Sequence, residues 1–218
     1  MRQKLACFCE WTLLGSLAAM AVFAVLPGYL MDLEDRLVLA AVQIGAALLA
    51  ALGRGKDRRG NVRRTARLLL AIYLTHLIGL LFFDGAFGRH RSFGLENWRL
   101  RTNLRPFATV AVYWNGMRRG WVSKSAAAVN LLGNLLALAP FGALLPFVSD
   151  KMKKTAPSLA LGAVSILLIE TTQLLAGCGS CDIDDFILNF AGFAAARLAV
   201  RPLVQKLNEA KLGRSKPG

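Results

Sequence analysis

Long apolar runs recur from one end of the chain to the other, and their length limits the possible folds more than any other feature. Several approach the roughly 17 to 25 residues that a helix needs to cross a bilayer. Hydrophobic residues make up 55% of the 218 residues and charged residues only 18%, against about 25% charged in a typical soluble protein. The sequence therefore predicts an integral membrane protein.

The apolar runs predict an all-α, polytopic membrane helix bundle with about six transmembrane helices. The expected spans are about Trp11–Leu30, Leu37–Leu52, Leu68–Phe83, Asn130–Val148, Pro157–Ala176 and Ile183–Val200. The first run also resembles a signal peptide, but no convincing small-residue cleavage site leads into a soluble domain, so we expect a retained span. Pro140 lies inside the fourth span and is expected to kink it.

Basic residues are concentrated in the segments that join these spans on one side. Placing both termini in the cytoplasm puts most of the 27 Lys and Arg residues on that side, as the positive-inside rule requires. We therefore expect a multi-pass protein of the cell membrane with both termini cytoplasmic. Topology and contact with anionic lipid account for the net charge of +14, so no nucleic-acid partner is expected.

The chain is expected to divide into three regions. They are two spans and a basic loop (1–67), the main membrane domain (68–200) and a basic tail (201–218).

One expected outer loop, Asp84–Ser125, is long and rich in arginine, against the usual charge bias. Its aromatic residues suit a segment at headgroup level, and apolar spacing after Pro106 predicts a short interfacial or re-entrant helix. This segment either rests on anionic headgroups or binds an anionic ligand through its arginines, which are also possible counter-ions for nearby acids. The arginines considered for these roles are Arg99, Arg101 and Arg105.

Polar residues recur at the expected outer ends of the last three spans. They are Asn130 and Asn134, Glu170 and Gln173, and Asp185 and Asn189. We expect all six at about one depth below the outer surface. They either join the helices by hydrogen bonds or line a ligand pocket, and the number of carboxylates and amides favours the pocket. Gly133 and Gly192 are expected to let the helices pack closely.

Two further residue patterns bear on chemistry. Cys178 and Cys181 form a C-x-x-C hairpin on the expected outer side, which suits a disulfide or a redox site. His76 and His90 lie far apart without metal-ligand spacing, so we expect no metal site and no cofactor. His76 is instead expected to hydrogen-bond a neighbouring helix.

Four motifs together resemble the VanZ-like family over about residues 68–200. They are NLRPF (Asn103–Phe107), NLLGNLLALAPFG (Asn130–Gly142), E-x-x-Q (Glu170–Gln173) and DIDDFILNFAG (Asp182–Gly192). The family is named for a protein of glycopeptide-resistance clusters that is associated with teicoplanin resistance. The resemblance implies a membrane protein of the cell envelope with a link to glycopeptide tolerance. Members often have an arginine shortly before the acidic run, where this chain has Cys-Gly-Ser-Cys.

The family's recurrent polar positions fall on Asn103, Pro106, Asn130, Asn134, Glu170, Gln173, Asp182, Asp184, Asp185 and Asn189. Except for Pro106, and with Arg105 added, these form the expected ligand-binding set. The expected role is to bind or modify an outer-leaflet lipid or an anionic lipid-linked envelope precursor. The alternatives are a lipid-acting enzyme with Glu170 or Asp185 as acid or base and, with less support, a thiol oxidoreductase or a transporter. No Ser–His or Cys–His arrangement marks a nucleophile, which favours a role other than catalysis.

Overall fold

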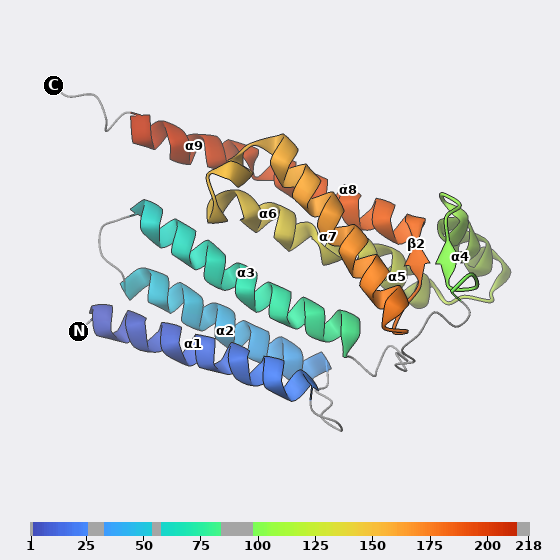
Figure 1. Cartoon of the computed structure of the whole chain (residues 1–218), viewed down its shortest axis with the longest axis horizontal. Coiled ribbons are helices and arrows are strands. Elements are labelled where there is room, and N and C mark those ends of the chain that lie inside the picture. The colour runs from blue at the N-terminus through green and yellow to red at the C-terminus, as the bar shows by residue number, and fades with distance from the viewer. Residues whose placement is uncertain (1, 26–32, 54–57, 84–97, 213–218) are drawn as a thin grey trace. The chain divides into compact units, whose positions relative to one another are not determined.

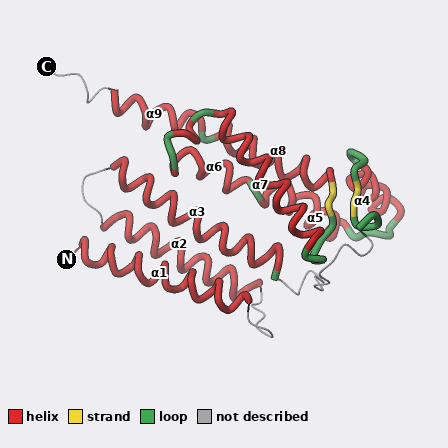
Figure 2. Tube along the Cα trace, viewed as in Figure 1, coloured by secondary structure: helices red, strands yellow, loops and turns green. Residues whose placement is uncertain are grey.

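The structure is a computed structural model that describes residues 2–25, 33–53, 58–83 and 98–212. This part of the chain is almost entirely helical, with one pair of two-residue strands (Figure 2). The helices are α1 (Arg2–Val25), α2 (Leu33–Gly53), α3 (Arg58–Phe82), α4 (Ala108–Arg119), α5 (Lys124–Ala137), α6 (Ala139–Val148), α7 (Thr155–Leu175), α8 (Ile183–Ala199) and α9 (Arg201–Leu212). The paired strands are β1 (Thr102–Asn103) and β2 (Cys181–Asp182). The expected all-α fold class is confirmed.

Five helical segments among the described residues are long and apolar enough to cross a membrane. They are Glu34–Gly53, Gly60–Phe82, Lys124–Val148, Thr155–Leu175 and Ile183–Glu209, and each overlaps one of the expected spans. The expected first span begins within α1 and continues into residues 26–30, which lie outside the described residues. The chain is therefore an all-α membrane helix bundle.

The chain divides into two compact units. The first comprises Met1–Thr102 and Glu170–Cys181, and the second comprises Asn103–Ile169 and Asp182–Gly218. The unit boundary therefore passes through α7 and through both short strands. The division expected from the sequence, at residues 67 and 200, is a different one and stays a prediction.

In the first unit, α1, α2 and α3 lie side by side (Figure 1). A small apolar core joins them, made of Leu13, Leu17, Ala47, Leu68 and Ile72. A polar contact crosses the same helices, because Gln43 donates to Ser16 Oγ at 3.0 Å and its Oε1 lies 2.9 Å from His76 Nε2. The expected hydrogen bond from His76 to a neighbouring helix is thus confirmed.

In the second unit, α8 packs against both α5 and α6 (Figure 1). The contact is close because two glycines have no side chain there. A Cβ at Gly192 would overlap the carbonyl oxygen of Leu135, and one at Gly142 would overlap that of Phe193. Gly192 therefore acts as expected. The expectation for Gly133 is wrong, because its missing Cβ would meet nothing within 4 Å.

The expected kink in the fourth span is also present. Here α5 ends at Ala137 and α6 begins at Ala139, while Leu138 between them leaves the helical conformation with φ −103 and ψ 5. Pro140 lies at the start of α6. A proline has no N–H to donate and its ring crowds the carbonyl four residues earlier, so the helix breaks just before it.

Candidate functional site

The polar residues of the second unit gather where α4 meets the start of α8. The helix that the sequence predicts after Pro106 is present as α4, but its own N-cap is Phe107, which has no side-chain acceptor. Asp184 of α8 supplies one instead. Its carboxylate accepts hydrogen bonds from the backbone N–H groups of Phe107, Thr109 (2.8 Å) and Val110 (3.1 Å). The acid therefore caps a helix that lies 75 residues away in sequence.

Phe107 takes an unusual backbone conformation at this junction. Its φ of 63 places it in the left-handed region, the only such non-glycine residue in the described part of the chain. Such a conformation costs a side-chain-bearing residue roughly 1–2 kcal/mol. The bond from its N–H to Asp184 contributes to holding it there.

Asp182 completes the same junction from the start of α8. Its Oδ1 accepts the N–H of Asp184 at 2.8 Å, which caps α8, and also the Asn103 amide at 3.1 Å. Its Oδ2 accepts the Thr109 hydroxyl at 2.5 Å. The side chains of Asp182 and Asp184 are both buried, at 7% and 1% exposure. These two acids, with Asn103 and Thr109, join α4 to α8.

The third acid of the run makes a different contact. Asn134 of α5 donates from its side-chain amide to Asp185 Oδ1, and both side chains are only half-buried. Asn189 donates to the backbone carbonyl of Asp185 at 2.8 Å, and Asn130 donates to that of Ala126 at 2.9 Å. The expected meeting of the fourth and sixth spans therefore occurs through one amide and one carboxylate.

Tyr113 of α4 belongs to this cluster, although it was absent from the residues expected at the site. Burial raises the pKa of its phenol, and the nearby carboxylates of Asp185 and Asp182 raise it further. The phenol therefore stays protonated and neutral at physiological pH. Its position among the aromatic residues of the loop was the one available sequence indication. Nothing in the sequence marked Thr109.

Glu170 and Gln173 belong to the first unit, where both are buried. Gln173 donates from its amide to the carbonyl of Leu81 at 3.3 Å, which joins the end of α7 to the end of α3. The meeting of Glu170 and Gln173 with the polar residues of α5 and α8 stays a prediction.

Arg101 has a role that the sequence analysis did not foresee. Its guanidinium donates to the backbone carbonyls of Gly179 (2.7 Å) and Leu174 (3.0 Å). It therefore holds the turn that follows α7. Arg105 is exposed, and its backbone N–H donates to Asn103 Oδ1 at 3.1 Å.

The same turn contains the C-x-x-C pair. All four cysteines are free thiols, and Cys178 is buried, with its thiol 3.8 Å from the Gln173 carbonyl. Within the described residues no three His, Cys, Asp or Glu side chains gather in a way that would hold a metal ion. His90 lies outside those residues.

The fold and these polar junctions define the class of protein as a helical membrane protein with a polar cluster where α4, α5 and α8 meet. The family model for VanZ/LLP1 matches residues 70–204. Because this match covers more than half of the chain, the protein belongs to the VanZ/LLP1 family. No curated protein and no solved structure matches the sequence.

Proposed function

We propose that the protein crosses the cell membrane several times and binds the headgroup of an outer-leaflet lipid or lipid-linked envelope precursor. The binding site is the cluster of Asn134, Asp185 and Tyr113. The observation that carries this proposal is the contact of Asn134 with Asp185. It places a half-buried carboxylate beside an amide. The same carboxylate lies near enough to the Tyr113 phenol to raise its pKa.

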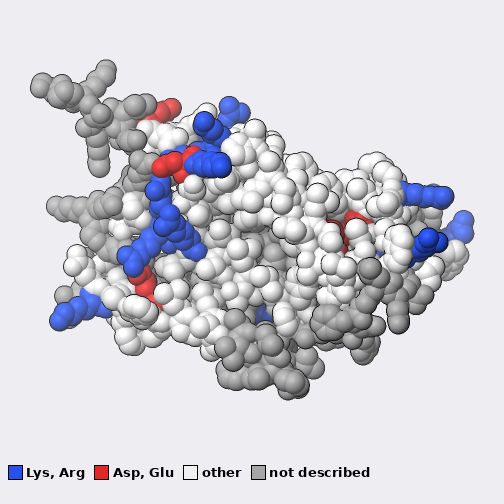
Figure 3. Space-filling model, viewed as in Figure 1, with Lys and Arg blue, Asp and Glu red and all other residues white. Residues whose placement is uncertain are grey.

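The surface around α4 supports a lipid ligand. Large apolar side chains are exposed there, namely Leu104, Phe107, Val112, Trp114 and Trp121. Basic side chains lie over the same helix (Figure 3), and the guanidinium of Arg119 stacks on the Trp121 ring at 5.2 Å. Aromatic and basic residues together are typical of a segment at headgroup level. The apolar side chains of this surface suit an apolar chain, and its basic side chains suit an anionic headgroup. The surface therefore fits a lipid that has both.

The side chains of the cluster limit which chemical groups of a headgroup can bind there. A carboxylate repels a phosphate but accepts hydrogen bonds from hydroxyl, amide N–H or ammonium groups. Tyr113 and Asn134 add groups that can donate as well as accept. We therefore assign the hydroxyl-rich or amide-rich part of the headgroup to Asp185. Its phosphate belongs beside the basic residues of α4, such as Arg118 and Arg119.

The test compares lipids that co-purify with the full-length protein. Mass spectrometry of gently purified wild type should detect a specific lipid or precursor, and Asp185→Asn should lose most of it. Asn at position 185 keeps an acceptor for the Asn134 amide, so the fold should survive. The control is Asp35→Asn, which removes one exposed carboxylate in the first turn of α2 and should change nothing. Equal lipid content in all three proteins would refute the site.

The same variants separate binding from catalysis. If the wild type converts a retained lipid into a product and Asp185→Asn does not, the protein is a lipid-acting enzyme with Asp185 as acid or base. Retention without conversion supports a binding role.

We further propose that binding confers tolerance to glycopeptides that carry an acyl tail. Expression of wild type should then raise the inhibitory concentration of teicoplanin, while Asp185→Asn should not.

A further inference from the structure

A buried arginine at the opposite end of α8 has unused hydrogen-bonding capacity. Arg197 is 1% exposed, and its Nη2 donates to the backbone carbonyl of Lys153 at 2.6 Å. Its Nε and Nη1 are buried with no hydrogen-bond partner. A guanidinium is always charged. Leaving N–H donors of a charged group buried without an acceptor is costly. These two nitrogens therefore indicate a missing acceptor.

The same unit contains a second buried polar group. Ser158 of α7 is 0% exposed, and its Oγ has no hydrogen-bond partner. A Cβ at Gly162 would lie 2.6 Å from the Phe193 ring, so these two positions face each other. Gly162 lies opposite Phe193, and Lys153, which is earlier in the chain, contacts Arg197, which is later. The two helices α7 and α8 therefore run in opposite directions here. One turn back from Gly162 is Ser158 and one turn on from Phe193 is Arg197, so both point into one layer.

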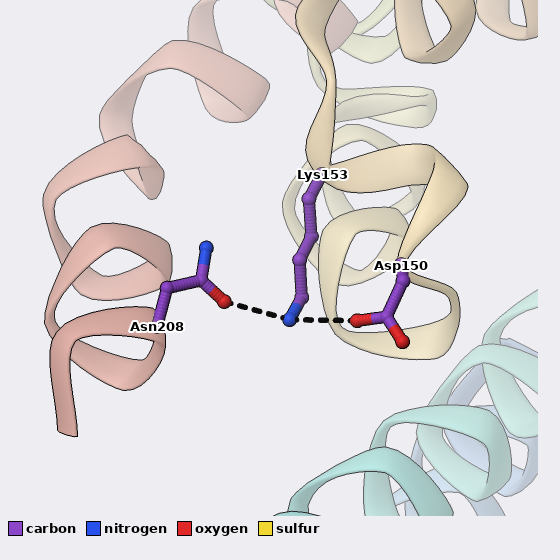
Figure 4. A network of polar contacts seen from close by, with 3 residues as sticks. All are labelled: Asp150, Lys153 and Asn208. Atoms are coloured by element: carbon purple, nitrogen blue, oxygen red, sulfur yellow. Dashed lines mark hydrogen bonds and ion pairs between the residues drawn. The ribbon is translucent and has the colours of Figure 1, made fainter. Parts of the chain in front are cut away.

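Arg197 contacts the backbone of Lys153, and the side chain of this lysine already has two partners. Lys153 Nζ lies 2.8 Å from Asp150 Oδ1 and 2.8 Å from Asn208 Oδ1 (Figure 4). This contact ties α9 to the connection between α6 and α7 and neutralises the ammonium. The charge of Arg197 is therefore left without a described carboxylate partner, beside a segment that also carries Lys151 and Lys154.

We propose that Arg197 and Ser158 form a binding site for a phosphate group. A phosphate has several acceptor oxygens, enough to bond to more than one guanidinium nitrogen and to the serine hydroxyl. Helix α7 begins at Thr155, directly after the segment that Arg197 contacts. The N-terminus of a helix carries a partial positive charge, which favours an anion. The phosphate belongs to the headgroup of an anionic lipid or to a soluble phosphate, which an experiment can distinguish. This site is separate from the one at Asp185.

The test uses full-length purified protein and three probes. They are short-chain phosphatidylglycerol, inorganic phosphate and a diacylglycerol with the same chains but no phosphate. Wild type should bind the phosphatidylglycerol and not the diacylglycerol. Arg197→Gln should weaken that binding about tenfold or more, because a charge-assisted contact is lost. Ser158→Ala removes one hydroxyl from a buried position and should weaken it several-fold.

Lys151→Gln is the matched control, because it removes an exposed positive charge from the same connection and should change binding less than about twofold. Binding of inorganic phosphate as well would identify a soluble anion as a ligand, and its absence would identify the lipid headgroup. The site is refuted if wild type binds neither phosphate probe. It is equally refuted if Lys151→Gln weakens binding as much as Arg197→Gln. Should Arg197→Gln fail to fold, unchanged binding by Ser158→Ala decides against the site.

Discussion

At the scale of single residues, two adjacent acids of one helical turn have different roles. Asp184 is buried, and three backbone N–H groups of another helix surround its carboxylate. Asp185, the next residue, is half-buried and contacts the Asn134 side chain. Successive residues on a helix point in different directions, about 100° apart, so one faces α4 and the other faces α5. The first acid therefore caps α4, and the second joins α8 to α5.

We expect Asp184→Ala to destabilise the protein by about 3 kcal/mol, because it leaves three N–H groups at the start of α4 without an acceptor. Thermal unfolding of the purified full-length protein measures this. Asp185→Asn, which keeps an acceptor for Asn134, should cost less than about 1 kcal/mol. Equal stability of the two variants would contradict the capping role.

The left-handed conformation of Phe107 predicts an unusual order of stabilities. Glycine adopts a φ of 63 without the steric cost that a Cβ imposes. Phe107→Gly should therefore be more stable than Phe107→Ala by about 1 kcal/mol, although both variants remove the same exposed ring. The comparison uses thermal unfolding of both proteins. The reverse order, which helix propensity alone would favour, would show that Phe107 is not left-handed.

At the scale of elements, α8 organises the second unit because α5 and α6 both pack closely against it. That closeness depends on the missing side chains of Gly142 and Gly192. The sequence showed that small residues are frequent in these helices, but it did not show which of them face a neighbour. The difference between Gly192 and Gly133 makes this testable.

Gly192→Ala should destabilise the protein by about 2 kcal/mol or more, because the new methyl group would overlap the Leu135 carbonyl of α5. Gly133→Ala is the matched change on α5. It should be neutral or stabilising by up to about 1 kcal/mol, since its methyl group meets nothing within 4 Å and alanine favours the helix. Thermal unfolding of both variants checks the pair, and a similar loss in both would mean that α8 does not pack on α5 in this register.

At the scale of the whole molecule, the proposed topology follows from the distribution of basic residues. With both termini in the cytoplasm, the tail is inside and the segment between α4 and α5 is outside. In a variant whose cysteines are replaced by serine, we expect Ser123→Cys to react with a membrane-impermeant thiol reagent on intact cells. Glu209→Cys should react only after the cells are opened. Both positions are exposed, so reaction of Glu209→Cys on intact cells would overturn the topology.

The sequence by itself determined the membrane helix bundle, most of its spans, the helix after Pro106 and the break before Pro140. These features depend on local patterns, namely apolar length and the geometry of proline, which act within a few turns of chain. The family motifs also identified the polar residues that we expected at the site. They did not show what each residue contacts.

Only the tertiary structure decided which groups of the chain each polar residue contacts. Asp182, Asp184, Asn103 and Arg101 were expected at a ligand site or as its counter-ions, and their described contacts are with the chain itself. The partners of Asp184 and Arg101 are backbone groups, which every residue carries and which therefore leave no trace in a sequence pattern. A backbone donor at one helix end meets its acceptor on another element only after the helices pack, so the pairing is visible only in three dimensions.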